Sequence, residues 1–153
     1  MAKYFTYEEL IKSDTANKLG IDNTPTSTEV VNNIIELMEV LDGIREEWTI
    51  ICDNNGLGSP VIIVNSGYRC MALNKAVGGS KTSSHTIGSA VDIVPKNGRN
   101  KDFLEFLDMY LMFHDIPFDE LINEKPMNGV PSWVHFSLKN NKGQKRRRVI
   151  TIK

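Results

Sequence analysis

The residue types best suited to chemistry lie in a short stretch near the middle of the chain. His85 and Asp92 stand seven residues apart, on either side of a turn at Gly88. The apolar run 89–94, closed by Pro95, predicts a short buried strand. A carboxylate in such a strand is costly unless it is paired, hydrogen-bonded or bound to a metal. Asp92 therefore needs a partner, and His85 is the nearest candidate.

A second histidine, His135, lies fifty residues further on, in the segment 132–138. Alternation along a strand puts Val134 and Phe136 on the apolar face and His135 on the other, which can be the face of Asp92. Two imidazoles and one carboxylate leave a fourth position open, which is the ligand set of a catalytic zinc. Spacing alone leaves a second interpretation open, in which two core histidines accompany a salt-bridged or helix-capping aspartate.

Several ordered motifs resemble those of the zinc D-Ala-D-Ala carboxypeptidase-like family. The pattern S-x-H-x-x-G-x-A-x-D spans residues 83–92, and Trp-Val-His follows at 133–135. Three further stretches fit the family, at residues 66–69, 73–80 and 118–124, so that the resemblance runs from about Tyr4 to Leu138. These proteins are peptidoglycan-cleaving metallopeptidases that include phage endolysins. The resemblance implies their hedgehog/DD-peptidase-like fold.

The resemblance also implies an activity and a cofactor. Zn²⁺ would be held by His85, Asp92 and His135 and would activate a water molecule to hydrolyse an amide bond in peptidoglycan stem peptides. The chain would act as a D-Ala-D-Ala carboxypeptidase or as a phage-type lysin endopeptidase. A non-catalytic, zinc-containing module that binds the cell wall is the alternative, because a fold need not carry an activity.

Three residues of the matching motifs are expected to meet the substrate. By resemblance, Arg69 binds the substrate carboxylate or the developing oxyanion, a bidentate contact that lysine cannot reproduce. Ser83 would hydrogen-bond the substrate or orient His85, and Trp133 would form a pocket wall. On residue type alone, an arginine after a strand is more often a surface ion-pair residue, and an indole beside a sheet is more often packing.

The general base is where the chain departs from the family pattern. In the best-known members it is an acidic residue three positions before the last histidine, but that position here is Ser132. The nearest carboxylates are Glu120 and Glu124, on the preceding predicted strand. The stretch 121–124 matches the L-I-x-E of the shorter phage-type branch, so the resemblance favours Glu124.

Length and composition bound the remaining possibilities. We expect one domain over residues 1–153, since 41% hydrophobic and 24% charged residues are ordinary for a globular chain with a core. The net charge of −1 does not point to any charged class of partner. No signal peptide or membrane span is visible, so we expect the chain to be made in the cytoplasm and to act at the cell wall if it is a phage-type lysin. We also expect a monomer. Cys52 and Cys70 form no disulfide framework.

Basic residues are concentrated at the C-terminal end. Residues 139–153 contain no acidic side chain and carry six Lys or Arg residues between positions 139 and 148. Such a cluster can serve an anionic polymer, including a cell wall, or can be a solvated basic edge strand. Aromatic residues do not interleave it, so we expect no specific nucleic-acid partner.

Hydrophobic periodicity predicts the elements that must position these residues. Helices are expected over residues 7–12, from a capping box at 26–29 to a turn at 53–56, and over 71–77 and 100–113. Strands are expected over 60–65, 89–94, 118–124, 132–138 and 146–153, with the last at an edge, and residues 13–27 are expected to form a surface loop. This irregular alternation predicts an α+β fold with a small antiparallel sheet packed against helices.

Overall fold

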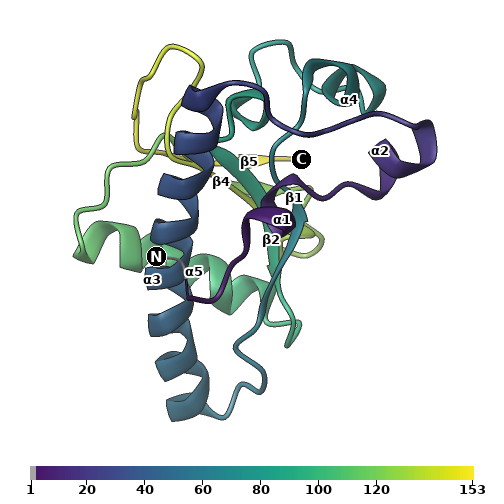
Figure 1. The fold of residues 1–153 in the computed structure, drawn as a ribbon. Coiled ribbons are helices and arrows are strands. Elements are labelled where there is room, and N and C mark those ends of the chain that lie inside the picture. Colours follow the sequence, from purple (N-terminus) through teal and green to yellow (C-terminus); the bar gives the residue numbers. More distant parts are fainter. Residues whose placement is uncertain (1–2) are drawn as a thin grey trace.

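The computed structural model describes residues 3–153 and has the expected α+β class, with helices packed against one five-stranded sheet (Figure 1). The helices are α1 (Tyr7–Ile11), α2 (Asp14–Leu19), α3 (Thr28–Asn55), α4 (Met71–Ala76), the 3₁₀ helix η1 (Ser84–Ile87) and α5 (Asn100–Phe113). The strands are β1 (Ile62–Ser66), β2 (Ala90–Pro95), β3 (Glu120–Glu124), β4 (Trp133–Ser137) and β5 (Arg148–Ile152).

The strand order is β1-β2-β4-β3-β5. The first three pairs in this order are antiparallel, but β5 pairs in parallel with β3, so the sheet is mixed rather than wholly antiparallel as predicted. The reason lies in where the chain leaves β4. Ser137 pairs with Glu120, so β4 ends where β3 begins, and β5 starts from that same end on the outer side of β3.

The long helix α3 begins and ends through local capping. Ser27 is its N-cap and accepts a hydrogen bond from the Val30 N–H, and Gly56 ends it in the left-handed conformation. The N-cap is therefore one residue later than the predicted box at 26–29 implies. Within the described residues 3–153, none of the helices combines the length and apolar character needed to cross a membrane.

The expectation of a loop over residues 13–27 was wrong for its first part, which contains α2. Ser13 caps this helix by accepting the Ala16 N–H, and Gly20 ends it with a φ of 66°. Ala16 is its one buried residue, so no apolar stripe marks it in the sequence.

The core lies between the sheet and the helices α3 and α5. Trp48 of α3 and Phe103 of α5 stack edge to face, with ring centroids 5.2 Å apart, and both are fully buried. Strand residues at alternate positions join them in one cluster, among them Val91, Ile93, Leu121, Val134 and Phe136. Because strand side chains alternate, the residues between these positions face the other side of the sheet.

Candidate metal centre

Two of the three predicted ligands are direct neighbours across the sheet. Asp92 of β2 and His135 of the central strand β4 are paired in register, and both point away from the helix-covered face. The third, His85, is buried in η1, just before β2. Gly88 joins η1 to β2 with a φ of 77°, and a Cβ there would lie 2.8 Å from Ile34. A turn at Gly88, as predicted, therefore connects His85 to the strand that carries Asp92.

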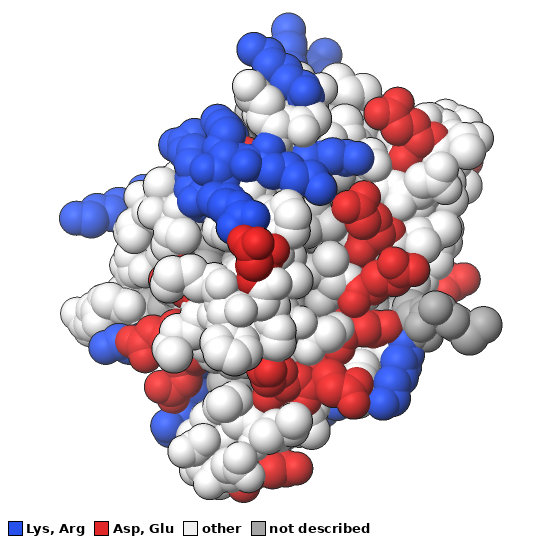
Figure 2. Space-filling model, turned by 90° about the vertical axis from the view of Figure 1, so that its left-hand side faces the viewer, with Lys and Arg blue, Asp and Glu red and all other residues white. Residues whose placement is uncertain are grey.

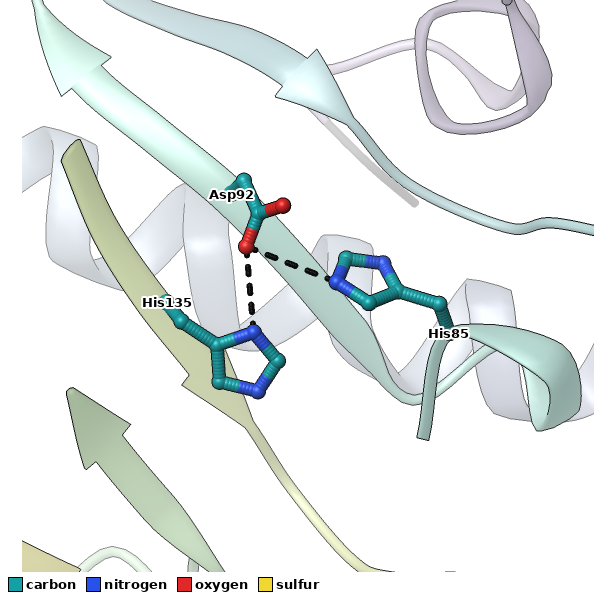
Figure 3. A group of neighbouring side chains, drawn as sticks. All are labelled: His85, Asp92 and His135. Carbon is teal, nitrogen blue, oxygen red and sulfur yellow. Dashed lines mark hydrogen bonds and ion pairs between the residues drawn. The ribbon is translucent and has the colours of Figure 1, made fainter. Parts of the chain in front are cut away.

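The ligand atoms of the three side chains converge on one point (Figure 3). One ligand atom from each of His85, Asp92 and His135 lies within 4.8 Å of the others. Asp92 Oδ1 lies 3.0 Å from His135 Nδ1 and 3.4 Å from His85 Nε2. The fold therefore brings together residues that the sequence separates by fifty positions.

The protonation of His85 follows from its contacts. Its Nδ1 lies 2.7 Å from the Gly67 carbonyl oxygen, which can only accept, so Nδ1 carries the hydrogen. Burial lowers the pKa of His85, which favours the neutral ring. Nε2 then turns a lone pair toward the carboxylate of Asp92. Two electron-rich atoms that face each other in this way are typical of a site for a cation, and a carbonyl that orients a histidine is typical of metal ligands.

Asp92 supplies the negative charge of the group. Burial alone would raise its pKa, but the hydrogen bond from His135 Nδ1 outweighs burial and holds the pKa of Asp92 well below its usual value. Arg69 Nη2 lies 3.5 Å from the other carboxylate oxygen. Two neutral imidazole nitrogens and one carboxylate oxygen fit Zn²⁺ and leave room for further ligands.

Arg69 reaches the site as expected, and its neighbours fix its position. Its Nε donates to Ser66 Oγ and its Nη1 to Asn74 Oδ1, both at 3.2 Å. Asn74 is buried in α4 and also donates to the carbonyl of Ser80. Sequence reasoning gave Asn74 no role, although a polar residue on the buried side of a short helix was a usable signal.

The other predicted substrate residues also line the cleft. Ser83 accepts the N–H of His85 at 3.2 Å and thereby starts η1. Trp133 lies two residues before His135 on the same side of β4 and forms part of the wall. Ser132 donates instead to the carbonyl of Lys125 and does not line the cleft. Ser132 therefore closes the loop between β3 and β4.

His114 lies away from the three converging side chains. Its Nε2 lies 3.0 Å from a carboxylate oxygen of Glu47, in an exposed pair between α5 and α3. It is the third histidine of the chain and lies outside the cleft.

The two candidate bases occupy equivalent places but differ in their neighbours. Ile122 pairs with His135, and Glu120 and Glu124 lie two residues to either side of Ile122, each at a diagonal of roughly 7–8 Å between backbones. Glu120 is engaged by two arginines of the C-terminal segment, at 3.6 and 3.7 Å. Glu124 forms no ion pair with any residue in 3–153, and burial raises its pKa.

These side chains line one open cleft of about 620 Å³. One of its walls was not foreseen. Residues 140–148, which sequence reasoning treated as a basic tail, contribute Asn140, Asn141, Lys142, Gln144, Arg146 and Arg148. Their place in the cleft depends on β5 pairing beside β3, which the sequence pattern does not reveal.

A model of the peptidase M15 family matches residues 3–116 of the 153. The matched stretch includes Arg69, His85 and Asp92 and ends before Glu124 and His135. No curated protein matches the chain.

Proposed function

The chain belongs to the peptidase M15 family, and from this premise we propose that it is a zinc metallopeptidase that hydrolyses an amide bond in peptidoglycan stem peptides. The family is one of zinc-dependent peptidases, so membership implies a metallopeptidase and a peptide substrate. The observation that carries the proposal is the convergence of His85, Asp92 and His135 within 4.8 Å in an open cleft.

The metal would be held by His85 Nε2, one Asp92 oxygen and one nitrogen of His135. When bound, Zn²⁺ supplies a water molecule of lowered pKa and polarises the scissile carbonyl. Gly67 keeps Nε2 of His85 free of hydrogen by accepting the hydrogen of Nδ1. The His85 ring is thus oriented before any metal binds.

The protein's own residues then handle the proton and the developing charge. Glu124 accepts the proton of the attacking water and delivers it to the leaving amine, for which its raised pKa suits it. Arg69, fixed by Ser66 and Asn74, binds the substrate carboxylate or the oxyanion. Ser83 holds His85, and Trp133 forms a wall of the cleft.

The first experiment measures zinc content and peptide hydrolysis together. We expect about one zinc per chain, and loss of both zinc and hydrolysis in His85→Ala and in His135→Ala, because two ligands hold zinc poorly. Release of D-alanine from a stem pentapeptide would identify a carboxypeptidase. Cleavage within a peptidoglycan suspension, with falling turbidity, would identify an endopeptidase.

The matched control is His114→Ala, which removes a histidine that lies outside the cleft. It should retain zinc and activity. A purified protein without zinc, or zinc unchanged in both ligand variants, would overturn the proposed metal centre. Zinc without hydrolysis of any stem peptide would support the cell-wall-binding module instead.

A further inference from the structure

The segment between β4 and β5 is a compact element within residues 139–148, which we call the basic segment. Asn140 Oδ1 accepts the backbone N–H groups of Lys142 and Gln144 at 3.0 and 2.9 Å. The Asn140 side-chain amide donates to Gln144 Oε1 at 2.8 Å. These bonds close the loop on itself, so its side chains are presented from a fixed backbone.

A buried carboxylate anchors the far end of the basic segment. Asp119 is fully buried and accepts three hydrogen bonds from Arg146, from the backbone N–H at 3.0 Å, Nε at 2.8 Å and Nη2 at 2.9 Å. The N–H of Arg148 donates to the carbonyl of Asp119 at 2.8 Å. The segment therefore enters β5 in a single register.

The cations of the basic segment divide into two sets. One set, which does not line the cleft, consists of Lys139, Lys145 and Arg147. Within it, Lys145 pairs with Glu36 of α3, and Arg147 pairs with Asp115. Figure 2 shows basic side chains gathered in the upper part of one face of the molecule. The other set, which lines the cleft, consists of Lys142, Arg146 and Arg148.

Within the cleft set, Lys142 and Arg148 keep donors free for a ligand. Neither side chain makes a hydrogen bond with any residue in 3–153, and Arg148 lies only loosely, at 3.6 Å, from Glu120. Arg146 already donates from Nε and Nη2 to Asp119. A guanidinium and an ammonium that line one cleft and make no hydrogen bond within the described residues are suited to a carboxylate.

The sheet places these cations opposite Arg69. Arg69 follows the edge strand β1, the metal-binding group lies on β2 and β4, and Arg148 lies on the other edge strand, β5. Three strand spacings separate β2 from β5, roughly 14 Å at about 4.8 Å each. An extended peptide covers that distance in about four residues.

We propose that Lys142 and Arg148 form a binding subsite for a carboxylate of the peptide substrate, within about four residues of the scissile bond. This inference rests on the proposed function and adds to it a preference for acidic peptides. A carboxylate of the peptide is favoured over a long anionic polymer because these two side chains line the same cleft as the metal-binding group.

The test compares two peptides that differ in one carboxylate. One is the stem pentapeptide L-Ala-γ-D-Glu-L-Lys-D-Ala-D-Ala, whose γ-linked glutamate keeps a free α-carboxylate, and the other has that carboxylate amidated. Calorimetry with the zinc-loaded full chain should show about tenfold tighter binding of the acidic peptide. The ratio should fall to about one in the double variant Lys142→Gln, Arg148→Gln, and Arg148→Glu should favour the amidated peptide.

Arg147→Gln is the matched control, since it removes the same charge from the adjacent residue, outside the cleft. It should keep the tenfold ratio. An equal response of the Arg147 and Arg148 variants, or no discrimination by the wild type, would overturn the subsite. So would tight binding of inorganic polyphosphate that Arg147→Gln weakens as much as the cleft variants, because the basic surface would then serve a polymer.

Each binding measurement is made in a Glu124→Gln background, which slows hydrolysis, and cleavage is measured separately with Glu124 in place, so the two proposals can fail separately. A preference for the acidic peptide without cleavage of either peptide would count against hydrolysis and leave the subsite standing. Cleavage of both peptides, together with equal affinity for them, would support hydrolysis and count against the subsite. Far-ultraviolet circular dichroism of each variant checks that β5 is retained.

Discussion

At the scale of single residues, Glu120 and Glu124 are a natural pair of comparison variants. Both lie on the cleft side of β3, at equal steps from the residue that pairs with His135. Their difference is electrostatic, since arginines lie close to Glu120, whereas burial raises the pKa of Glu124. Glu124 is therefore the carboxylate whose affinity for a proton is raised and whose oxygens are not engaged by an arginine.

Glu124→Gln should lower kcat about 10²–10⁴-fold, because general acid–base catalysis contributes about that much. Zinc content should stay at the wild-type value, since Glu124 is not among the converging ligands. Steady-state kinetics on a stem pentapeptide, with metal analysis of the same samples, measures both.

Glu120→Gln is the companion variant, and it should keep kcat within about tenfold of the wild type, since it leaves general acid–base catalysis intact. If Glu120→Gln lost more activity than Glu124→Gln, the assignment of the base would be reversed. If the wild type bound zinc but had no activity, the two variants could not be compared by kcat, because neither protein would be catalytic.

The sequence was informative about the residues that do chemistry and less so about those that hold them. His85, Asp92 and His135 could be singled out from residue type, strand alternation and motif, and the structure brings them together. Asn74 could not be paired with Arg69 in advance, because their contact depends on how α4 packs beside the end of β1. Positioning contacts of this kind arise from tertiary packing and leave no periodic pattern.

At the scale of elements, the close approach of α1 to the end of β1 supports the metal-binding group. The N–H of Tyr68 donates to the Leu10 carbonyl at 2.6 Å, and a Cβ on Gly67 would overlap the same carbonyl. The carbonyl of Gly67 in turn holds His85. Backbone contact between two elements therefore orients a predicted ligand.

Gly67→Ala should destabilise the protein by about 1–3 kcal/mol, as overpacking against backbone does, and should weaken zinc binding by displacing the carbonyl that holds His85. Urea unfolding and a zinc titration measure the two effects. Gly43→Ala is the control, since its Cβ would meet only the end of a flexible side chain, the Tyr110 hydroxyl at 2.6 Å. Similar losses in both variants would show that Gly67 has no special role.

The entrance to β5 predicts a dependence on pH. Burial would raise the pKa of Asp119, but its hydrogen bonds from Arg146 lower it below the usual value. A carboxyl whose native pKa is lowered stabilises the fold above its unfolded pKa of about 3.9, and this stability is lost as pH falls through the native pKa.

Asp119→Asn should cost about 1–2 kcal/mol at pH 7, a range kept small because Arg146 is partly exposed. The difference from wild type should shrink as the pH falls below about 4. Urea unfolding of both proteins between pH 7 and pH 3 measures it. A difference that stays constant over this range would contradict the role of the charged pair.

The fold was predictable where periodicity and turn signals were strong, and less so elsewhere. The helix α5 occupies the predicted residues 100–113, since a clear apolar face defined it. The short helix α2 has one buried residue and was missed. The parallel pairing of β5 was also missed, since alternation identifies a strand but not the neighbour beside which it lies.

At the scale of the whole molecule, the proposed metal links two distant parts of the chain, so zinc should stabilise the native state. Free zinc at about 1,000 times its Kd contributes about 4 kcal/mol, or about 10 °C in Tm for a chain of this length. Thermal melts with zinc and with a chelator measure the shift. His135→Ala should abolish the shift and His114→Ala should keep it, whereas a shift that survives loss of His135 would place the zinc elsewhere.

The position of β4 at the centre of the sheet also bears on the order of synthesis. His85 and Asp92 emerge from a ribosome well before His135, and the strand that carries His135 must insert between β2 and β3. A nascent chain that has emerged only as far as residue 116 already contains the whole family-matched stretch but just two of the three ligands. The complete group of three ligands would thus form only after β4 has been made, and a shortened product that ends before β4 would lack His135.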